Sequence, residues 1–259
     1  MAAGEGAIVS DYGQSLLLGE MQKQAAPVRG RYVNKYGANL DIDTATTPEI
    51  LWTVGGMYSW PSTATAMEIY SASTADRSPS TGARTITVQG IGSSAGSTQS
   101  ETVTLNGQSA VNLVNPFYRV NRLIVATAGT NGSNVGIITV RTKTGGTTHC
   151  NIVAGEGQTL IAHWTVPVNK RARVRKVWAQ FPDATNQSNA QLRLRFRSGS
   201  AINTKHVFSI NTTLQEYAFD WPIGGPEAPA LADIYIEVVT VAGNNTQIQG
   251  GFDVSIEDA

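Results

Sequence analysis

The sequence predicts an all-β protein with two jelly-roll-like β-sandwich domains, or one large sandwich, preceded by an extended N-terminal arm. Three observations predict this fold class. The chain contains 26 glycines and is rich in Thr, Ser and Asn, a composition that suits short strands joined by tight turns. Runs that alternate apolar and polar residues recur from residue 67 onward. Turn dipeptides such as Asn106-Gly107 separate these runs, and no helical period interrupts them.

The length and composition exclude several classes of protein. A chain of 259 residues can bury one or two sizeable cores. Cys150 is the only cysteine, which excludes an intrachain disulfide and a cysteine-rich zinc site. The formal net charge of zero provides no overall attraction to nucleic acid or to an anionic membrane. The first residues do not resemble a signal peptide and no run is long enough to span a bilayer, so we expect a protein made in the cytoplasm.

Residues 1–61 are expected to form the arm. The only helix-like piece is Asp11 to Lys23, where Asp11 can cap a short helix. The rest of the arm is rich in aromatic residues and glycine, with neither a helical nor a strand period. Such a segment is expected to lie extended on another surface, either the protein's own sheets or a neighbouring subunit. Its aromatic residues are Tyr32, Tyr36, Trp52, Tyr58 and Trp60.

The alternating runs fall into two series that part near residue 155. The first sandwich is assigned to residues 62–155, with strands expected at 68–71, 84–89, 101–105, 122–126, 136–140 and 151–153. The second is assigned to residues 156–259, with strands expected at 159–166, 173–181, 191–196, 206–210, 216–219, 234–241 and 252–256. Two series of this kind are typical of sandwiches.

The residue types that carry chemistry do not form a recognisable motif. His149, His163 and His206 lie in predicted strands and lack the spacing of a metal pair. Cys150 follows His149 directly, so the two side chains point to opposite faces of a strand, and a lone thiol on an apolar strand is typical of a core. The acidic residues are scattered, and no glycine pair belongs to a nucleotide-binding loop. We therefore expect no catalytic site, no cofactor and no metal.

A basic stripe departs from this pattern. Arg193, Arg195 and Arg197 alternate with apolar residues, so the three arginines share one face of a strand. The stripe is either a solvated outer face or a surface that binds an acidic partner, because arginine pairs with carboxylates through two hydrogen bonds. Acidic residues of the same chain or of a symmetry mate can supply that partner, and they are Glu237, Asp253, Glu257 and Asp258.

Several pieces of the chain, in order, resemble a family of virion structural proteins from tailed phages, notably phages of cyanobacteria. The pieces cover roughly residues 33–140. They are Val33-Asn34-Lys35-Tyr36-Gly37, Asp41-Ile42-Asp43-Thr44, Trp52 with Gly55-Gly56-Met57-Tyr58, residues 81–88, residues 101–107, and Tyr118-Arg119-Val120-Asn121-Arg122.

The resemblance implies a non-enzymatic particle component, either a capsid decoration (cement) protein or a tail-associated one. It implies the major capsid protein or other virion proteins as partners and the virion as the location. A homo-oligomer, and specifically a trimer, is the expected assembly, because repeated copies multiply modest contacts. The five aromatic residues of the arm are the hypothesised contact with a neighbour, since aromatics dominate interface energies. The main rival is a carbohydrate-binding module, which would present Trp164, Trp178 and Trp221 on one exposed face.

Overall fold

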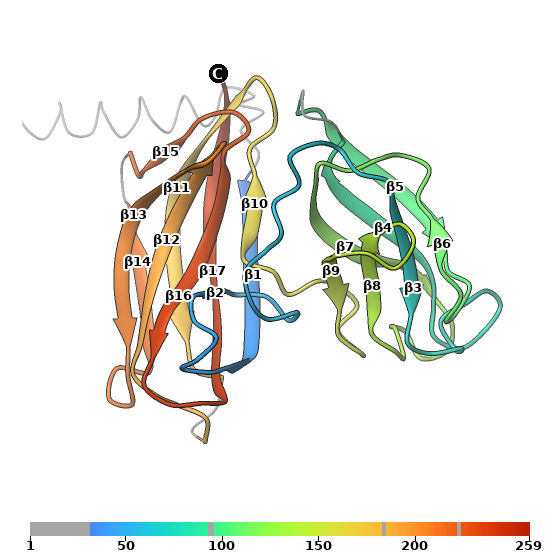
Figure 1. Ribbon diagram of the computed structural model, residues 1–259, viewed down its shortest axis with the longest axis horizontal. Helices are drawn as coiled ribbons and strands as arrows, with labels where there is room; N and C mark the ends of the chain where they lie inside the picture. Colours follow the sequence, from blue (N-terminus) through green and yellow to red (C-terminus); the bar gives the residue numbers. More distant parts are fainter. Residues whose placement is uncertain (1–31, 93–95, 183–184, 222–223) are drawn as a thin grey trace, which may run out of the picture.

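The computed structural model describes residues 32–92, 96–182, 185–221 and 224–259, and these residues form two β-sandwiches that lie side by side (Figure 1). The described ranges contain no helix, so the all-β prediction is confirmed for them. No helix that could cross a membrane is found in that part of the chain. The short helix expected at Asp11 to Lys23 lies outside the described residues.

The larger sandwich consists of two five-stranded sheets. Sheet A has the order β1-β17-β11-β14, with β15 also paired to β11. Sheet B has the order β10-β16-β12-β13, with β2 also paired to β16. The strands of sheet A are β1 (Tyr32–Ile42), β11 (Lys170–Gln180), β14 (Glu216–Asp220), β15 (Glu227–Ala228) and β17 (Thr246–Asp258). Those of sheet B are β2 (Glu49–Ile50), β10 (His163–Thr165), β12 (Ala190–Ser198), β13 (Ala201–Ile210) and β16 (Asp233–Val241).

The strand order of the larger sandwich is that of a jelly roll. Without the two-residue strands β2 and β15, eight strands remain, and in chain order the first, eighth, third and sixth form sheet A. The second, seventh, fourth and fifth form sheet B. This arrangement corresponds to the double-sheet jelly roll, so that expectation is confirmed for the larger sandwich.

The smaller sandwich is inserted into the larger one, between β2 and β10. Its two sheets have the orders β6-β3-β8-β9 and β5-β4-β7. Their strands are β3 (Met67–Ser71), β4 (Ala83–Ile91), β5 (Thr98–Thr104), β6 (Val111–Asn112), β7 (Arg119–Ala128), β8 (Ile138–Thr142) and β9 (Thr148–Ile152). Every strand expected from residue 67 on overlaps a strand of the structure.

The segment 32–61 differs from the expected arm, because much of it belongs to the larger sandwich. β1 pairs antiparallel with β17 almost along its whole length, from Tyr32 opposite Ser255 to Ile42 opposite Thr246. β2 pairs with β16. The larger sandwich therefore includes residues outside the expected bounds 156–259. The pairing satisfies the backbone groups of the first strand, which an extended arm would have to satisfy elsewhere.

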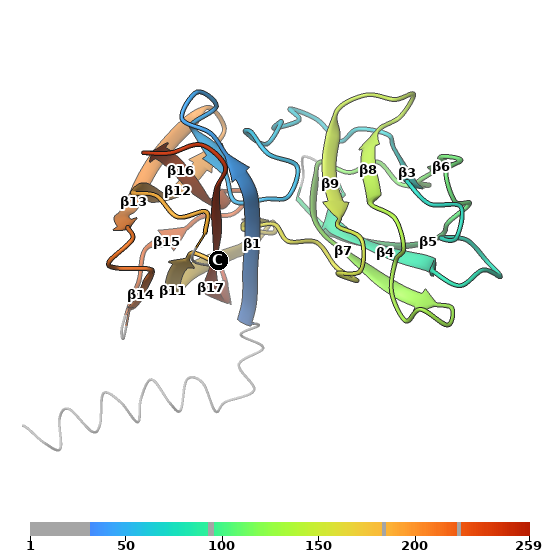
Figure 2. The same cartoon turned by 90° about the horizontal axis from the view of Figure 1, so that it is seen from below.

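Each sandwich has a core, and the smaller core continues onto the larger sandwich. One cluster of buried side chains lies between sheets A and B. The second fills the smaller sandwich and extends to Trp52, Tyr58, Ile161 and Tyr235, the last of which lies on β16 of sheet B. In Figures 1 and 2, β1 and β10 lie on the side of the larger sandwich that faces the smaller one, whereas β13 and β14 lie on the far side. We call the contact region between the sandwiches the junction.

Candidate functional site

The three aromatic residues Trp52, Tyr58 and Trp60 fill the junction. Trp52 and Tyr58 are only 3% and 2% exposed, and Trp60 is partly buried. The ring centroid of Tyr58 lies 5.5 Å from that of Trp52 and 4.8 Å from those of Trp60 and His163. Trp60 also contacts Tyr235 of β16, at 5.1 Å. These rings pack within the chain, so the hypothesis that they bury against a neighbouring subunit does not fit their placement.

A buried ion pair lies in the middle of the junction. Arg119, the first residue of β7, donates two hydrogen bonds to Asp233 of β16, from Nε to Oδ1 at 3.0 Å and from Nη2 to Oδ2 at 3.1 Å. Both residues are 1% exposed. Arg119 Nη1 also donates to the carbonyl oxygens of Pro61 and Tyr118, and Thr165 Oγ1 donates to Asp233 at 2.7 Å. Two sandwiches and the segment between them are therefore joined through one guanidinium group.

The charges around Asp233 keep its carboxylate ionised. Burial acts to raise the pKa of Asp233, but the hydrogen bond from His163 and the charge and hydrogen bonds of Arg119 outweigh it and lower the pKa to about 2. Burial lowers the pKa of His163, whose ring is fully buried. The ion pair with Arg119 is thus the contact that balances the buried negative charge.

The arginine stripe lies on the outer face of sheet B, beside the junction. Arg197 Nη1 lies 3.4 Å from Asp233 Oδ2, and its guanidinium carbon lies 5.0 Å from the centre of the Trp60 ring. Arg195 pairs with Glu237 at 2.7 Å. The Nε atom of Arg193 is buried and has no hydrogen-bond partner in the described part of the chain. Two of the three arginines therefore have carboxylate partners in their own chain.

Of the acidic partners considered for the stripe, only Glu237 takes that role. Glu257 and Asp258 of β17 instead pair with the basic residues of β11, Arg171 with Glu257 at 3.2 Å and Lys170 with Asp258. Asp253 accepts a hydrogen bond from Asn34. The alternation of charges along adjacent strands places these groups on the outer faces of the sheets.

Tyr32 and Tyr36 lie apart from the other predicted contact residues. Both belong to β1, and Tyr32 is 64% exposed. Tyr36 is partly exposed, and its hydroxyl is hydrogen-bonded to Gln158. The structure therefore divides the eight predicted contact residues between the junction, the stripe and the outer face of sheet A.

Sequence reasoning did not identify the buried titratable groups of the junction. Lys35 of β1 is 2% exposed, and its ammonium group donates to the carbonyl oxygen of Asn121. Burial, together with the charge of Arg122, lowers the pKa of Lys35 to about 7. Burial raises the pKa of Cys150 to about 12 and, with Arg119, lowers that of His149 to about 4. A thiol of this kind is unreactive, as expected of a core cysteine.

Three of the acidic residues that could have served in catalysis instead make contacts within the fold. Glu101 accepts hydrogen bonds from the amides of Val114 and Asn115, and Asp43 accepts one from Asn245. Glu227 pairs with Arg173. Within the described ranges, no group of three or more His, Cys, Asp or Glu residues is arranged to hold a metal ion.

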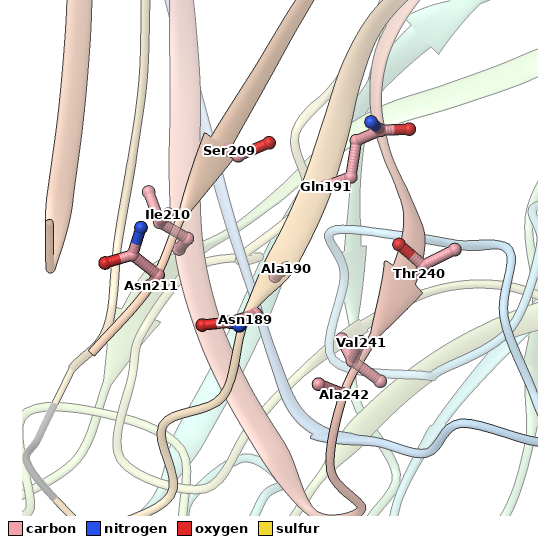
Figure 3. Close-up of a pocket in the computed structure, with 9 residues that line it drawn as sticks. All are labelled: Asn189, Ala190, Gln191, Ser209, Ile210, Asn211, Thr240, Val241 and Ala242. Atoms are coloured by element: carbon pink, nitrogen blue, oxygen red, sulfur yellow. The ribbon is translucent and has the colours of Figure 1, made fainter. Parts of the chain in front are cut away.

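A pocket lies where β12, β13 and β16 meet at the end of sheet B (Figure 3). Asn189 to Gln191, Ser209 to Asn211 and Thr240 to Ala242 line it. The amide of Ala242 donates to the carbonyl of Asn189 at 2.9 Å, which ties the strand ends together. The lining side chains include amides and hydroxyls but no titratable group, so the pocket offers hydrogen bonding without acid–base chemistry.

The far side of the larger sandwich carries a different kind of surface, which we call the rim. It consists of β13, the turn that follows and β14, which are edge strands of sheets B and A. Four exposed apolar side chains belong to it: Ile202, Val207 and Leu214, each 49% exposed, and Phe219, which is 39% exposed. A rim of two edge strands with exposed apolar side chains is a candidate protein interface.

Aromatic rings connect the two edges of the rim. Phe208 of β13 stacks on Tyr217 of β14 at 4.8 Å, and His206 stacks on Phe219 at 5.0 Å. His206 Nε2 and the Tyr217 hydroxyl are hydrogen-bonded at 2.6 Å. These side-chain contacts join β13 to β14, which share no backbone ladder.

The comparisons with known proteins add no family. No protein-family model and no curated protein matches the sequence. Among solved structures, T=1 particles derived from infectious bursal virus match with a TM-score of 0.13 and 7% identity, over 89% of this chain and 79% of that one. A TM-score of this size carries no structural argument.

Proposed function

We propose that this chain is a structural component of a phage particle, a capsid decoration protein that binds across capsid subunits and stabilises the head. The observation that carries the proposal is the rim, where four exposed apolar side chains lie along two edge strands and the turn between them, at the side away from the junction. Edges of this kind can extend a sheet across a subunit boundary or pack against an apolar surface. The partner is the assembled capsid shell.

The rigid connection between the sandwiches supports this role. The continuous core and the Arg119–Asp233 pair hold the two bodies in one orientation. A protein that bridges two subunits stabilises them best when its own domains keep a fixed orientation. A flexible link between the domains would lower the effective concentration of the second binding surface once the first is bound. The order of phage-like sequence pieces between residues 33 and 140 supports the same proposal, and β-sandwich architecture alone does not determine it.

Co-sedimentation with capsid shells that lack the protein tests the proposal. We expect the purified chain to be a homo-oligomer, specifically a trimer, by light scattering, and to sediment with the shells. Introducing charge at the rim with Ile202→Asp and Val207→Asp should weaken shell binding at least about tenfold, because a carboxylate would be desolvated in the contact.

The matched control is Leu40→Asp, which changes a 45% exposed side chain of β1 on another part of the surface. It should leave shell binding unchanged. If the folded protein does not sediment with the shells, a role in the tail or baseplate becomes the favoured proposal. If the rim variants bind the shells as well as the control does, the rim is not part of the contact with the capsid.

A further inference from the structure

A second surface, on the outer face of sheet A, combines an aromatic platform with free polar groups. Trp178 of β11 is partly exposed and lies opposite Gly251 of β17 on one side and Ala218 of β14 on the other. A Cβ atom at Gly251 would lie 3.0 Å from Trp178 Nε1 and 3.1 Å from Cε2. The indole of Trp178 therefore lies over the backbone of β17. Gly251 and Ala218, which lie opposite Trp178 on the two neighbouring strands, are too small to cover the indole.

Polar side chains surround this platform without being used by the fold. A pocket at Trp178 is lined by Lys176 and Gln180 of the same strand and by Glu216 of β14. No side-chain hydrogen bond or ion pair joins these three residues to the rest of the described chain. An ammonium group, an amide and a carboxylate thus offer both donors and acceptors within one pocket beside an aromatic ring.

We propose that Trp178 and these three side chains form a binding site for a neutral polysaccharide. The negative face of an aromatic ring attracts the weakly positive C–H groups on the apolar face of a pyranose, and the hydroxyls at the edge of that sugar need mixed donors and acceptors. Lys176 has Asp253 and Asp220 as cross-strand neighbours, which disfavours an anionic ligand at this position. The site goes beyond the proposed function and does not depend on it.

The expectation that a carbohydrate-binding face would present three tryptophans together is wrong, because only Trp178 lies on this face. Trp164 is 7% exposed and belongs to the core of the larger sandwich, and Trp221, which follows β14, packs against that core. The three tryptophans therefore do not share a face. The platform depends on Trp178 alone, so modest affinity for a single site is expected, which an oligomer would raise through avidity.

Affinity electrophoresis of the full chain through gels containing laminarin, hydroxyethylcellulose or dextran tests the proposal. We expect at least one of these polysaccharides to retard the protein and to shift its tryptophan fluorescence. Trp178→Ala should weaken retardation at least about tenfold, whereas Trp178→Phe, which retains an aromatic ring, should weaken it much less. Gln180→Ala, a surface change that leaves the platform intact, should weaken it by a smaller factor.

Tyr70→Ala is the matched control, because Tyr70 is a partly buried aromatic residue of β3 in the smaller sandwich, outside both the platform and the rim. It should bind the polysaccharide as the wild type does. The proposal is overturned if none of the three polysaccharides retards the wild type, or if Trp178→Ala and Gln180→Ala are both retarded like the wild type. Loss of shell binding in Trp178→Ala, without polysaccharide binding in the wild type, would make this face a protein contact instead.

Discussion

At the residue scale, Arg119 and Asp233 form the contact on which the junction depends most. Arg119→Met removes the guanidinium group that makes two hydrogen bonds to a carboxylate that is 1% exposed. The buried charge then lacks its main partner, and we expect the free energy of unfolding to fall by about 3–5 kcal/mol. Urea unfolding monitored by circular dichroism measures the change.

Arg173→Met is the control for that loss. Arg173 pairs with Glu227, but the two side chains are 30% and 39% exposed, so their pair should contribute only about 0–1 kcal/mol. The double variant Arg119→Met with Asp233→Leu should regain much of the lost stability, because no uncompensated charge remains. An equal cost for the two single arginine variants would contradict the importance given to the buried pair.

Lys35 provides the second prediction at this scale, and it depends on pH. Its pKa is about 7 in the folded state against 10.5 in the unfolded chain. Between these values the unfolded state binds a proton that the folded state lacks, so stability increases as pH rises through this window and the full cost is present below pH 7. Lys35→Met should therefore be more stable than the wild type at pH 7, by about 1–4 kcal/mol. That advantage should shrink by about 2 kcal/mol at pH 9.

The measurement is a pair of urea unfolding series at pH 7 and pH 9, with Lys143→Met as the control. Lys143 is exposed, so its replacement should change stability little and equally at both pH values. A pH-independent difference between the wild type and Lys35→Met would mean that the amine is not desolvated in the folded state.

At the scale of the elements, local alternation predicted strands wherever one face of the strand meets an apolar core. β11 and β12 follow this pattern, whereas β16 is buried on both faces along most of its length. β1 does not follow the pattern, because its buried positions include Lys35, Gly37 and Asn39, which face the junction or approach backbone closely. A pattern with polar residues at buried positions cannot be recognised from periodicity.

The pairing of elements was also beyond local reasoning. β1 pairs with β17 although about 200 residues separate them, and the smaller sandwich is inserted between them. Local reasoning likewise assigned Trp52, Tyr58 and Trp60 to a contact with a neighbouring subunit, whereas these rings pack in the junction of their own chain. Arg119 and Asp233 lie at strand starts, where charged residues are usually solvated, so only the fold reveals their pairing.

Gly37 tests the integration of β1 into the sandwich. A Cβ atom at this position would lie 2.1 Å from the carbonyl oxygen of Leu51 and 2.4 Å from the amide nitrogen of Ala162. Gly37→Ala should therefore displace β1 and lower the free energy of unfolding by about 3 kcal/mol. An increase in proteolysis within residues 32–61 should accompany the loss.

Gly132→Ala is the appropriate control for the change at Gly37. Gly132 has a φ of 73°, but a Cβ atom added to it would have no neighbouring atom within 4 Å, so the change should cost only the strain of that conformation, about 1 kcal/mol. If Gly37→Ala were no more destabilising than Gly132→Ala, β1 would have to be held more loosely than its pairing indicates.

At the scale of the whole molecule, the continuous core predicts that the two sandwiches unfold together. The smaller core includes Tyr235 of sheet B, and Tyr58 contacts both His149 of the smaller sandwich and His163 of the larger one. Separating the sandwiches would expose these side chains and the charge of Asp233 to water, so partial unfolding carries a large cost. We expect one cooperative transition, with equal calorimetric and van't Hoff enthalpies.

Tyr58→Ala should break this coupling, because the lost ring leaves a cavity at the junction that costs about 3–5 kcal/mol. Hydrogen exchange followed by mass spectrometry can then assign the order of unfolding by segment. In the variant, residues 67–152 should exchange at lower urea concentration than residues 163–259, whereas in the wild type both segments should exchange together. Separate transitions in the wild type would mean that the sandwiches unfold as independent bodies, and the proposed bridge between capsid subunits would lose its physical basis.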